Sequence, residues 1–332
     1  MNYFCTYFDV NYLIRGLALY RSLMRWATPC TLYVLCMNDE TYQILVSLKL
    51  PGLIPVLLSD FENSDIELVR VKSSRTLIEY YFTCTPALPI YLLKQNPEIE
   101  AIHYCDADMF LYSSFSSVLQ TFKGKSIQLI PHCFPPAKLF AERSGKYNVG
   151  LVSFRRDVNG IAALEWWRKC CIEWCYDRWE NGLYADQKYL DEMPGLFKNV
   201  SVVDSKGVFA APWNIGLYRV HKVNGKVFVN DRELVVYHVE GVKALWSGVI
   251  LFYSQRFFYR IPSSVKKLIY IPYIRELIKV NEELLSVGIT IPMLHASRGF
   301  ATTKVTSVIA RVARMYTVVE YFLRGCIVII KE

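Results

Sequence analysis

The sequence predicts an α/β fold in which a mainly parallel central sheet is flanked by helices. In the first third of the chain, short apolar runs typical of strands alternate with longer segments of helical periodicity. Such alternation is typical of parallel sheets covered on both faces. Acidic residues follow two of the strand-like runs, Asp9 after the first and Asp106 after a later one. Since ligands bind beyond the carboxyl ends of parallel strands, these residues indicate a binding site at that edge.

The expected elements follow one another closely in the N-terminal half of the chain. Leu13, Leu17 and Leu23 recur at helical spacing behind the first strand, and Asn38 is a suitable N-cap for the second helix. In order, we expect strands at residues 3–8, 31–37, 53–58 and 100–104, and helices at residues 12–26, 39–48 and 86–94.

The pattern changes after Leu151. The elements expected there are a long aromatic helix at residues 161–179 and short strands near residues 200–203, 227–229 and 234–237. This change divides one domain, residues 1–249, into halves of about residues 1–150 and 151–249. Residues 250–332 are basic and rich in tyrosine, and we expect them to form a helical C-terminal extension.

The net charge of +8 is concentrated in that extension. Residues 250–332 hold 12 Lys and Arg against 5 Asp and Glu, whereas residues 1–249 hold 26 against 25. No uninterrupted apolar stretch reaches the roughly 18 residues that a membrane-spanning helix needs. Apolar residues recur at helical spacing over residues 305–323, with arginines among them, so this segment is expected either to contact an anionic membrane peripherally or to pack on the core. Nucleic acid is not an expected partner, because the charge is modest and no nucleic-acid module is recognisable.

The ten cysteines are scattered through apolar segments, and we expect no signal peptide because the first strand-like run begins at Asn2. We therefore expect reduced thiols and a cytoplasmic protein. Cys170, Cys171 and Cys175 lie close together, but no second Cys or His pair follows at ligand spacing, which argues against a structural zinc site.

The most informative segment reads Ile-His-Tyr-Cys-Asp-Ala-Asp-Met-Phe over residues 102–110. In an extended segment side chains alternate between faces, so Asp106 and Asp108 point the same way, beyond the apolar run. Two carboxylates there can bind a hard divalent cation, which in turn can hold a diphosphate. Taken alone, the pair could equally be a solvated turn.

Further motifs accompany this aspartate pair in a fixed order. Together they resemble the GT-A glycosyltransferases, specifically the glycogenin-like and lipopolysaccharide galactosyltransferase-like family 8, over residues 2–246. The matching segments are Thr6-Tyr7-Phe8-Asp9-Val10-Asn11-Tyr12, Tyr104-Cys105-Asp106-Ala107-Asp108, Asn148-Val149-Gly150, Ala185-Asp186-Gln187 and His238-Val239-Glu240-Gly241-Val242-Lys243. The resemblance implies a GT-A (Rossmann-like) fold with a donor half and an acceptor half, a UDP-sugar as donor, and Mn²⁺ or Mg²⁺ as cofactor.

The resemblance also implies roles for particular residues. Asp106 would contact the ribose and the metal, and Asp108 and His238 would complete the metal ligands. The residues implied in binding the nucleotide and its diphosphate are Thr6, Tyr7, Asp9, Asn11, Tyr12, Ala107, Gly241 and Lys243. Asp9 alone could instead form an ordinary Asx turn, and a lone histidine is more often structural. The family's Lys-Pro-Trp is replaced here by Lys243-Ala244-Leu245-Trp246.

The sugar pocket is implied by the two remaining motifs. Asn148 and Gly150 would line it, Asp186 would hold hydroxyls of the transferred sugar, and Gln187 would face the reacting carbon. Asp186 could otherwise be a helix N-terminal residue, and Lys188 and Asp191 depart from the family pattern. Arg75 and Glu79 are candidates to reach the diphosphate or the sugar, and Pro212-Trp213-Asn214 is a candidate acceptor loop.

We therefore expect a metal-dependent glycosyltransferase that moves a sugar from a UDP-sugar to a hydroxyl of a surface glycan, such as lipopolysaccharide, or of a lipid-linked acceptor. The resemblance implies retention of configuration. Same-face internal return beside Gln187 and double displacement through Asp186 both stay open. Two other functions are weighed: a nucleotidyltransferase that makes sugar nucleotides, and a non-catalytic nucleotide-sugar-binding protein. We expect the protein in the cytoplasm, with residues 250–332 either in peripheral contact with the inner face of the membrane or packed on the core.

Overall fold

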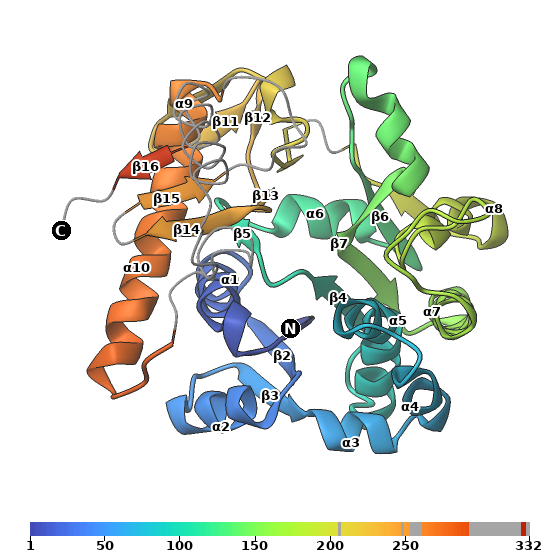
Figure 1. Cartoon of the computed structure of the whole chain (residues 1–332). Coiled ribbons are helices and arrows are strands. Elements are labelled where there is room, and N and C mark those ends of the chain that lie inside the picture. Colours follow the sequence, from blue (N-terminus) through green and yellow to red (C-terminus); the bar gives the residue numbers. More distant parts are fainter. Residues whose placement is uncertain (205–206, 247–248, 253–260, 292–326, 330–332) are drawn as a thin grey trace, which may run out of the picture.

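A seven-stranded sheet with strand order β3-β2-β1-β4-β7-β6-β8 forms the centre of the molecule (Figure 1). The computed structural model describes residues 1–204, 207–246, 249–252, 261–291 and 327–329. The strands of the sheet are β1 (Asn2–Phe8), β2 (Cys30–Cys36), β3 (Leu53–Leu57), β4 (Ala101–Cys105), β6 (Ile127–Pro131), β7 (Tyr147–Arg155) and β8 (Val200–Val202). Only β7 runs against its neighbours β4 and β6, and the other neighbouring pairs of this sheet are parallel. The expected α/β fold with a mainly parallel sheet is confirmed.

Helices cover both faces of the sheet, as alternating side chains of its strands require. The helices are α1 (Leu13–Trp26), α2 (Asp39–Leu48), α3 (Leu58–Asn63), α4 (Ile66–Lys72), α5 (Leu77–Gln95), α6 (Ser116–Phe122), α7 (Val158–Glu173), α8 (Met193–Leu196), α9 (Ser263–Val265) and α10 (Ile271–Ser286). Phe4 of β1 packs in one apolar core with α1 and α10. Its neighbour Cys5 packs in a second core with α5 and α7. Figure 1 shows these two helix pairs on opposite sides of the sheet.

Smaller sheets extend the C-terminal half of the chain. β13 (Val236–His238) lies between β5 (Met109–Leu111) and β9 (Phe209–Ala210). The other strands are β10 (Val220–Val223), β11 (Lys226–Val229), β12 (Arg232–Glu233), β14 (Val242–Trp246), β15 (Val249–Phe252) and β16 (Ile327–Ile329). A 3-10 helix over Val10–Tyr12 and another over Pro136–Ser144 border the region where β1 and β4 end and the antiparallel β7 begins.

Two expected helices have different bounds in the structure. The helix expected at residues 86–94 begins earlier, at Leu77, because Thr76 and Glu79 form a capping box in which each side chain bonds the other's main chain. The helix expected at residues 161–179 ends at Glu173. Beyond it, the main chain of Asp177 donates to Glu79 (3.1 Å), so tertiary contacts with the start of α5 replace the last helical turns.

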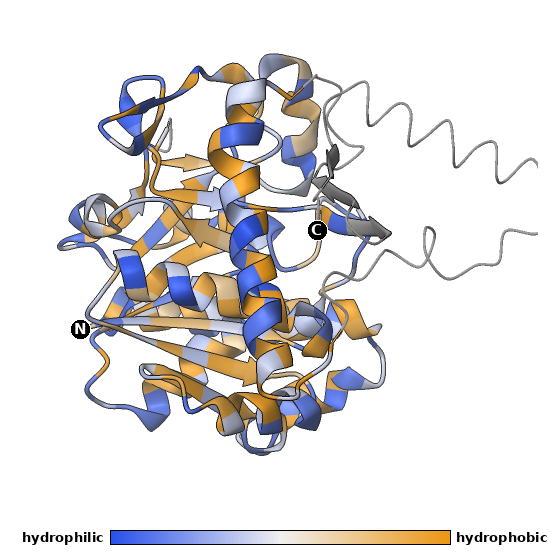
Figure 2. Cartoon of the chain, turned by 90° about the vertical axis from the view of Figure 1, so that its left-hand side faces the viewer, coloured by the Kyte–Doolittle hydropathy of each residue, from blue (hydrophilic) through white to orange (hydrophobic). Residues whose placement is uncertain are grey.

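The C-terminal extension shares its core with the rest of the domain. α10 buries Tyr273, Ile274 and Leu277 in the same core as α1, and Figure 2 shows it crossing that face with apolar and polar residues alternating along it. We expected a helical extension, but it also contains strands, since β15 and β16 pair antiparallel. Residues 305–323 lie outside the described residues. Among those described, no helix is long and apolar enough to cross a membrane, and the cysteines are free thiols.

Removal of the Thr76 cap is expected to destabilise the fold. Thr76→Ala removes the acceptor of the Glu79 main-chain N–H and should lower the free energy of unfolding by about 1 kcal/mol. Thr76→Ser keeps the acceptor and serves as the matched control. Urea denaturation measures both variants, and equal stability of the Ala and Ser variants would contradict a capping role.

Candidate active site

The aspartate pair lies in a tight turn where β4 ends. The Asp106 N–H donates to the Gly150 carbonyl of β7 (2.9 Å), and the Met109 N–H donates to the Asp106 carbonyl (3.0 Å). The chain then enters β5, which pairs antiparallel with β13 so that Met109 faces His238. The Val239 N–H donates to the Asp108 carbonyl (2.8 Å). This register brings His238 to the aspartates from a distant part of the sequence.

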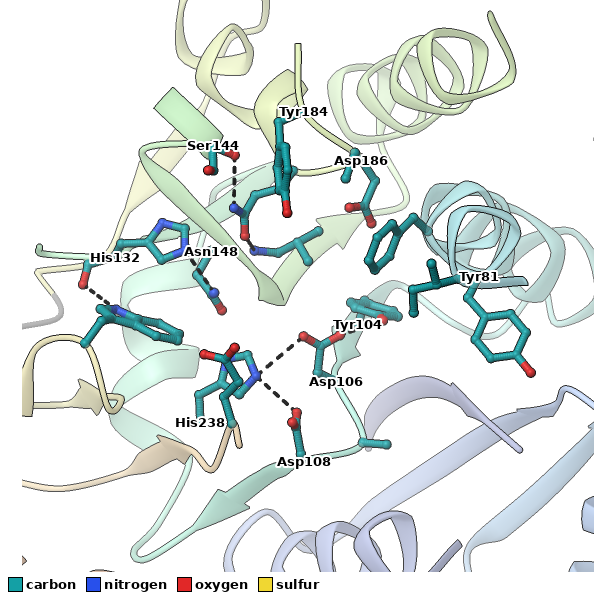
Figure 3. Close-up of a pocket in the computed structure, with 18 of the residues that line it drawn as sticks. Tyr81, Tyr104, Asp106, Asp108, His132, Ser144, Asn148, Tyr184, Asp186 and His238 are labelled. Atoms are coloured by element: carbon teal, nitrogen blue, oxygen red, sulfur yellow. Dashed lines mark hydrogen bonds and ion pairs between the residues drawn. The ribbon is translucent and has the colours of Figure 1, made fainter. Parts of the chain in front are cut away.

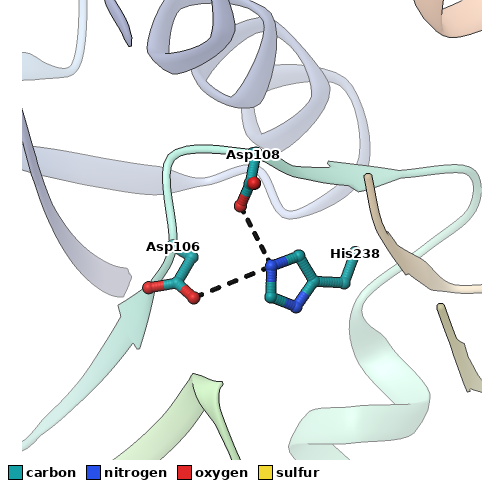
Figure 4. A group of neighbouring side chains, drawn as sticks. All are labelled: Asp106, Asp108 and His238. Atoms are coloured by element: carbon teal, nitrogen blue, oxygen red, sulfur yellow. Dashed lines mark ion pairs between the residues drawn. The ribbon is translucent and has the colours of Figure 1, made fainter. Parts of the chain in front are cut away.

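Three side chains converge at this point (Figure 4). His238 Nε2 lies 3.0 Å from Asp108 Oδ1 and 3.8 Å from Asp106 Oδ2. One ligand atom from each residue lies within 4.8 Å of the other two, and no other such group of His, Cys, Asp and Glu occurs among the described residues. The Tyr104 hydroxyl donates to the second carboxylate oxygen of Asp106 (2.7 Å), which orients that carboxylate.

The electrostatics of this cluster favour a positive charge between the carboxylates. Burial raises the pKa of Asp106 to about 6, although His238 acts the other way. Burial also acts to raise the pKa of Asp108, but His238 and Arg15 hold it below its usual value. The pKa of His238 is raised to about 9, because the attraction of Asp108 outweighs burial. Two carboxylate oxygens and an imidazole nitrogen are a donor set that suits a divalent cation such as Mn²⁺ or Mg²⁺, so these residues fit the implied metal.

A cavity of about 1050 Å³ extends from this cluster along the carboxyl edge of the sheet (Figure 3). Its volume lies at the upper end of the usual range for small-molecule sites. Most of the expected site residues line it. These are Tyr7, Asp9, Asn11, Tyr12, Asp106, Ala107, Asp108, Asn148, Asp186, Gln187 and His238.

The loop after β1 forms an Asx turn and also lines the cavity. Asp9 does form an Asx turn, since its carboxylate accepts from the main-chain N–H of Asn11 (2.9 Å) and from its side-chain amide (3.0 Å). The turn places Tyr12 at the cavity with 44% of its surface exposed. The Arg15 guanidinium lies 4.5 Å from the Tyr12 ring centre and donates to the Val242 carbonyl (2.8 Å). This loop can therefore offer a flat aromatic face to a planar base.

Three residues expected near the donor, Thr6, Arg75 and Glu79, do not line the cavity. Thr6 points into the sheet interior and is fully buried, because side chains alternate along β1 and its neighbour Tyr7 takes the cavity face. The Arg75 guanidinium stacks 4.0 Å from the Tyr176 ring centre and donates to the Ile172 carbonyl (3.1 Å). Glu79 is engaged in the cap of α5. Arg75 and Glu79 thus hold the segment after α7 in place.

The glycines of the motifs act through backbone geometry. A Cβ on Gly150 would come within 2.9 Å of Asp106 Oδ2 and 2.7 Å of Asn148 Oδ1, so only glycine allows β7 to approach the aspartate turn this closely. Gly241 has a φ of +86°, which allows the turn between β13 and β14. Neither glycine lines the cavity, and Lys243 of β14 does not line it either.

The sugar-pocket motifs meet in another part of the cavity lining, where Asn148, Asp186 and Gln187 lie. Asp186 is buried with Oδ2 lacking a hydrogen-bond partner, and burial raises its pKa to about 7. The Gln187 side chain donates to the Ser144 carbonyl (3.0 Å) and accepts from the Val149 N–H (3.4 Å). A buried carboxylate oxygen without a protein partner is suited to accept from hydroxyls of a bound molecule. Asp186 thus lines the cavity, and the nearest helix begins after it, at Lys188.

Several lining residues were not expected from the sequence. They include Tyr81, His132, Phe134, Trp179 and Tyr184. No motif marks them, because α5, the segment after β6 and the segment after α7 bring them together from three parts of the chain. Trp213, expected only as part of an acceptor loop, lies next to the metal cluster, with its ring 5.4 Å from that of His238.

Fold and site together define a protein of the GT-A glycosyltransferase fold. The chain aligns with a crystal structure of the galactosyltransferase LgtC in complex with donor and acceptor sugar analogues, with a TM-score of 0.50, 16% identity, and coverage of 86% of this chain and 99% of that one. This likeness confirms the expected fold. No protein-family model matches the chain.

Sequence comparison identifies two relatives and, through them, the family of the chain. The chain is 32% identical over 248 residues to the uncharacterized protein YfnF of Bacillus subtilis, covering 72% of this chain and 81% of YfnF. It is 30% identical over 292 residues to the uncharacterized protein YfnD of the same organism, covering 86% of this chain and 91% of YfnD. The chain belongs to the family of YfnF and YfnD.

The buried Asp186 carboxyl gives a pH-dependent stability. Its pKa of about 7 in the folded protein lies above that of an unfolded aspartate, about 3.9. The folded state therefore holds this proton more tightly, and its contribution to stability falls by up to about 1.4 kcal/mol per pH unit between roughly pH 4 and pH 7.

Asp186→Asn removes this titration. Relative to the wild type, the variant should gain stability from pH 5 to pH 7.5, as measured by urea denaturation at both values. Asp60→Ala, at an exposed position of α3, is the control and should show no such trend. An Asn variant whose stability relative to wild type is the same at both pH values would contradict the raised pKa.

Proposed function

We propose that the protein is a metal-dependent glycosyltransferase that transfers a sugar from a UDP-sugar to an acceptor hydroxyl. The observation that carries this proposal is the convergence of Asp106, Asp108 and His238 in the lining of a large cavity in a GT-A fold. The cavity carries a partly exposed aromatic ring near the cluster and a buried, unsatisfied carboxylate oxygen on another wall. These features suit a base, a diphosphate and a sugar in that order.

Asp106, Asp108 and His238 would hold the divalent cation. When bound, the cation would neutralise the diphosphate and stabilise the charge that develops on departing UDP. The Tyr104 hydroxyl keeps the Asp106 carboxylate oriented, and Gly150 of β7 lies close against the same carboxylate. The protein residues thus provide a preorganised anionic site that needs little rearrangement on metal binding.

The donor would lie along the wall from Tyr12 to Asp186. Tyr12 would stack on the uracil, with Asp9 and Asn11 beside it, and Asp186, Asn148 and Gln187 would bind the transferred sugar. Gly241 and Lys243 follow His238 along the chain. Lys243 would contact the diphosphate, and this contact requires β14 to move toward the cavity.

We also propose retention of the anomeric configuration by a same-face path. Gln187 is an amide and a poor nucleophile, and its side chain is held by Ser144 and Val149. Double displacement through Asp186 would need an ionised carboxylate, and burial raises the pKa of Asp186 to about 7, which weakens it as a nucleophile.

The acceptor proposed is a surface glycan or a lipid-linked saccharide. Trp213, whose indole N–H donates to the His132 carbonyl (2.8 Å), would border the acceptor near the metal cluster. The concentration of positive charge in residues 250–332 supports a cytoplasmic protein in peripheral contact with an anionic membrane surface, where such acceptors occur.

The proposal is tested by thermal stabilisation with UDP and a panel of UDP-sugars, each with and without Mn²⁺. A nucleotide that binds the folded state stabilises it by about 2.7 kcal/mol at 100 times its Kd. We expect one UDP-sugar to raise the melting temperature only when Mn²⁺ is present. Slow Mn²⁺-dependent hydrolysis of the same UDP-sugar, measured as UDP release, would distinguish an enzyme from a binding protein.

Asp108→Ala should abolish both effects because it removes a carboxylate from the cluster. Asp60→Ala removes an exposed carboxylate from α3 and should change neither. If no UDP-sugar stabilises the wild type under any condition, UDP as the donor nucleotide is refuted. If Asp108→Ala behaves as the wild type, the assigned metal site is refuted.

A further inference from the structure

The imidazole of His132 occupies a buried position between the sugar-pocket wall and the loop that carries Trp213. His132 directly follows β6 and lines the cavity. Its ring is stacked on Phe134, with centres 4.7 Å apart at 12°, and lies 5.2 Å from the Trp213 ring. Figure 3 shows it beside Asn148 at the cavity wall. None of the motifs in the sequence includes this residue.

A chain of hydrogen bonds determines which ring nitrogen of His132 carries a proton. Nδ1 lies 3.3 Å from the Lys146 carbonyl, which can only accept, so Nδ1 is the donor. Burial lowers the pKa of His132 to about 3, so the ring is neutral near neutral pH. Nε2 therefore has no proton and accepts from the Asn148 side-chain amide at 3.2 Å.

The orientation of the Asn148 amide, at the other end of this series of hydrogen bonds, is also determined. Asn148 Oδ1 accepts from the Gly150 N–H at 3.0 Å. If the carboxamide turned over, its NH₂ group would face the Gly150 N–H and its oxygen would face the unprotonated Nε2, which would place two donors together and two acceptors together. His132 and Gly150 therefore hold the Asn148 amide in a single orientation.

We propose that His132 is a positioning residue that fixes the Asn148 carboxamide for recognition of the transferred sugar. This inference rests on the proposed function. With one N–H and one lone pair already engaged, Asn148 has one N–H and one lone pair left for a ligand. A fixed donor and acceptor can discriminate between sugars that differ in the orientation of one hydroxyl, because the wrong epimer leaves a buried polar group unpaired.

The main chain of His132 has a separate structural task. Its carbonyl accepts from the Trp213 indole and from the Asn214 amide, both at 2.8 Å, and so anchors the loop beside His238. These bonds do not involve the imidazole. A substitution of the side chain therefore removes the bond to Asn148 while it keeps the anchor of the loop.

The test compares His132→Phe with His132→Gln. Phenylalanine keeps a flat ring against Phe134 and Trp213 but cannot accept a hydrogen bond, whereas the glutamine amide oxygen can replace Nε2 as acceptor. His221→Phe, on β10 outside the cavity, is the matched control. The measurements are kcat/KM for Mn²⁺-dependent UDP-sugar hydrolysis with a pair of epimeric donors, the affinity for UDP by calorimetry, and the melting temperature.

We expect His132→Phe to lower kcat/KM for the preferred donor by about 10- to 100-fold and to reduce the preference between the epimers. UDP affinity should be unchanged, because Asn148 faces the sugar and not the nucleotide in the proposed arrangement. His132→Gln should restore most of the activity and the preference, and His221→Phe should leave both as in the wild type.

Three results would overturn the inference. Full activity and unchanged preference in His132→Phe would show that the bond to Asn148 is not used. Equal losses in the Phe and Gln variants, with a lowered melting temperature, would show a role in packing alone. A wild type that neither binds nor hydrolyses any UDP-sugar would refute the proposed function and this inference with it, whereas an active wild type with an unaffected Phe variant refutes only the role of His132.

Discussion

Strand β5 follows the aspartate turn directly and pairs antiparallel with β13, with Met109 opposite His238. The hydrogen bond from Val239 to the Asp108 carbonyl extends this pairing into the turn itself. A slip of one residue would send the imidazole to the other face of the small sheet, since side chains alternate along a strand. The cluster of Asp106, Asp108 and His238 therefore depends on the register of one short strand pair.

That cluster brings two carboxylates together in a poorly solvated place. Without a positive partner, one of the two would protonate, and the raised pKa of Asp106 shows this tendency. His238 supplies the partner as an imidazolium, and a divalent cation would supply it more strongly. Burial raises the pKa of Asp106 and Asp186, which costs folding stability, but it also leaves their carboxylate oxygens ready to accept hydrogen bonds from ligands. Sites that bind ligands often lower the stability of the fold in this way.

The antiparallel strand β7 links the aspartate turn to the cavity wall. Its Gly150 approaches the aspartate turn, and its Asn148, two residues earlier in the sequence, lines the cavity. His132, at the end of the neighbouring β6, accepts from the Asn148 amide through its ring and from Trp213 through its carbonyl. The aspartate turn, the cavity wall at Asn148 and the loop that carries Trp213 are thus attached to the adjacent strands β4, β7 and β6 of one sheet, so their relative positions are preorganised.

The sequence by itself determined the alternation of strands and helices, the bounds of α2 behind its Asn38 cap, and the carboxylates at the end of β4. These are local properties, set by side-chain periodicity, capping and the end of an apolar run. Most of the site residues were predicted from a family resemblance that rests on short motifs. Thr6 and Arg75 do not line the cavity, because the face of the strand on which a side chain lies and the packing of Arg75 on Tyr176 depend on distant neighbours. The aromatic side chains Tyr81, Phe134, Trp179 and Tyr184 in the cavity lining, the Asp186 oxygen without a hydrogen-bond partner and the proton on His132 Nδ1 were decided only by the tertiary structure, since burial and hydrogen-bond partners arise when remote segments meet.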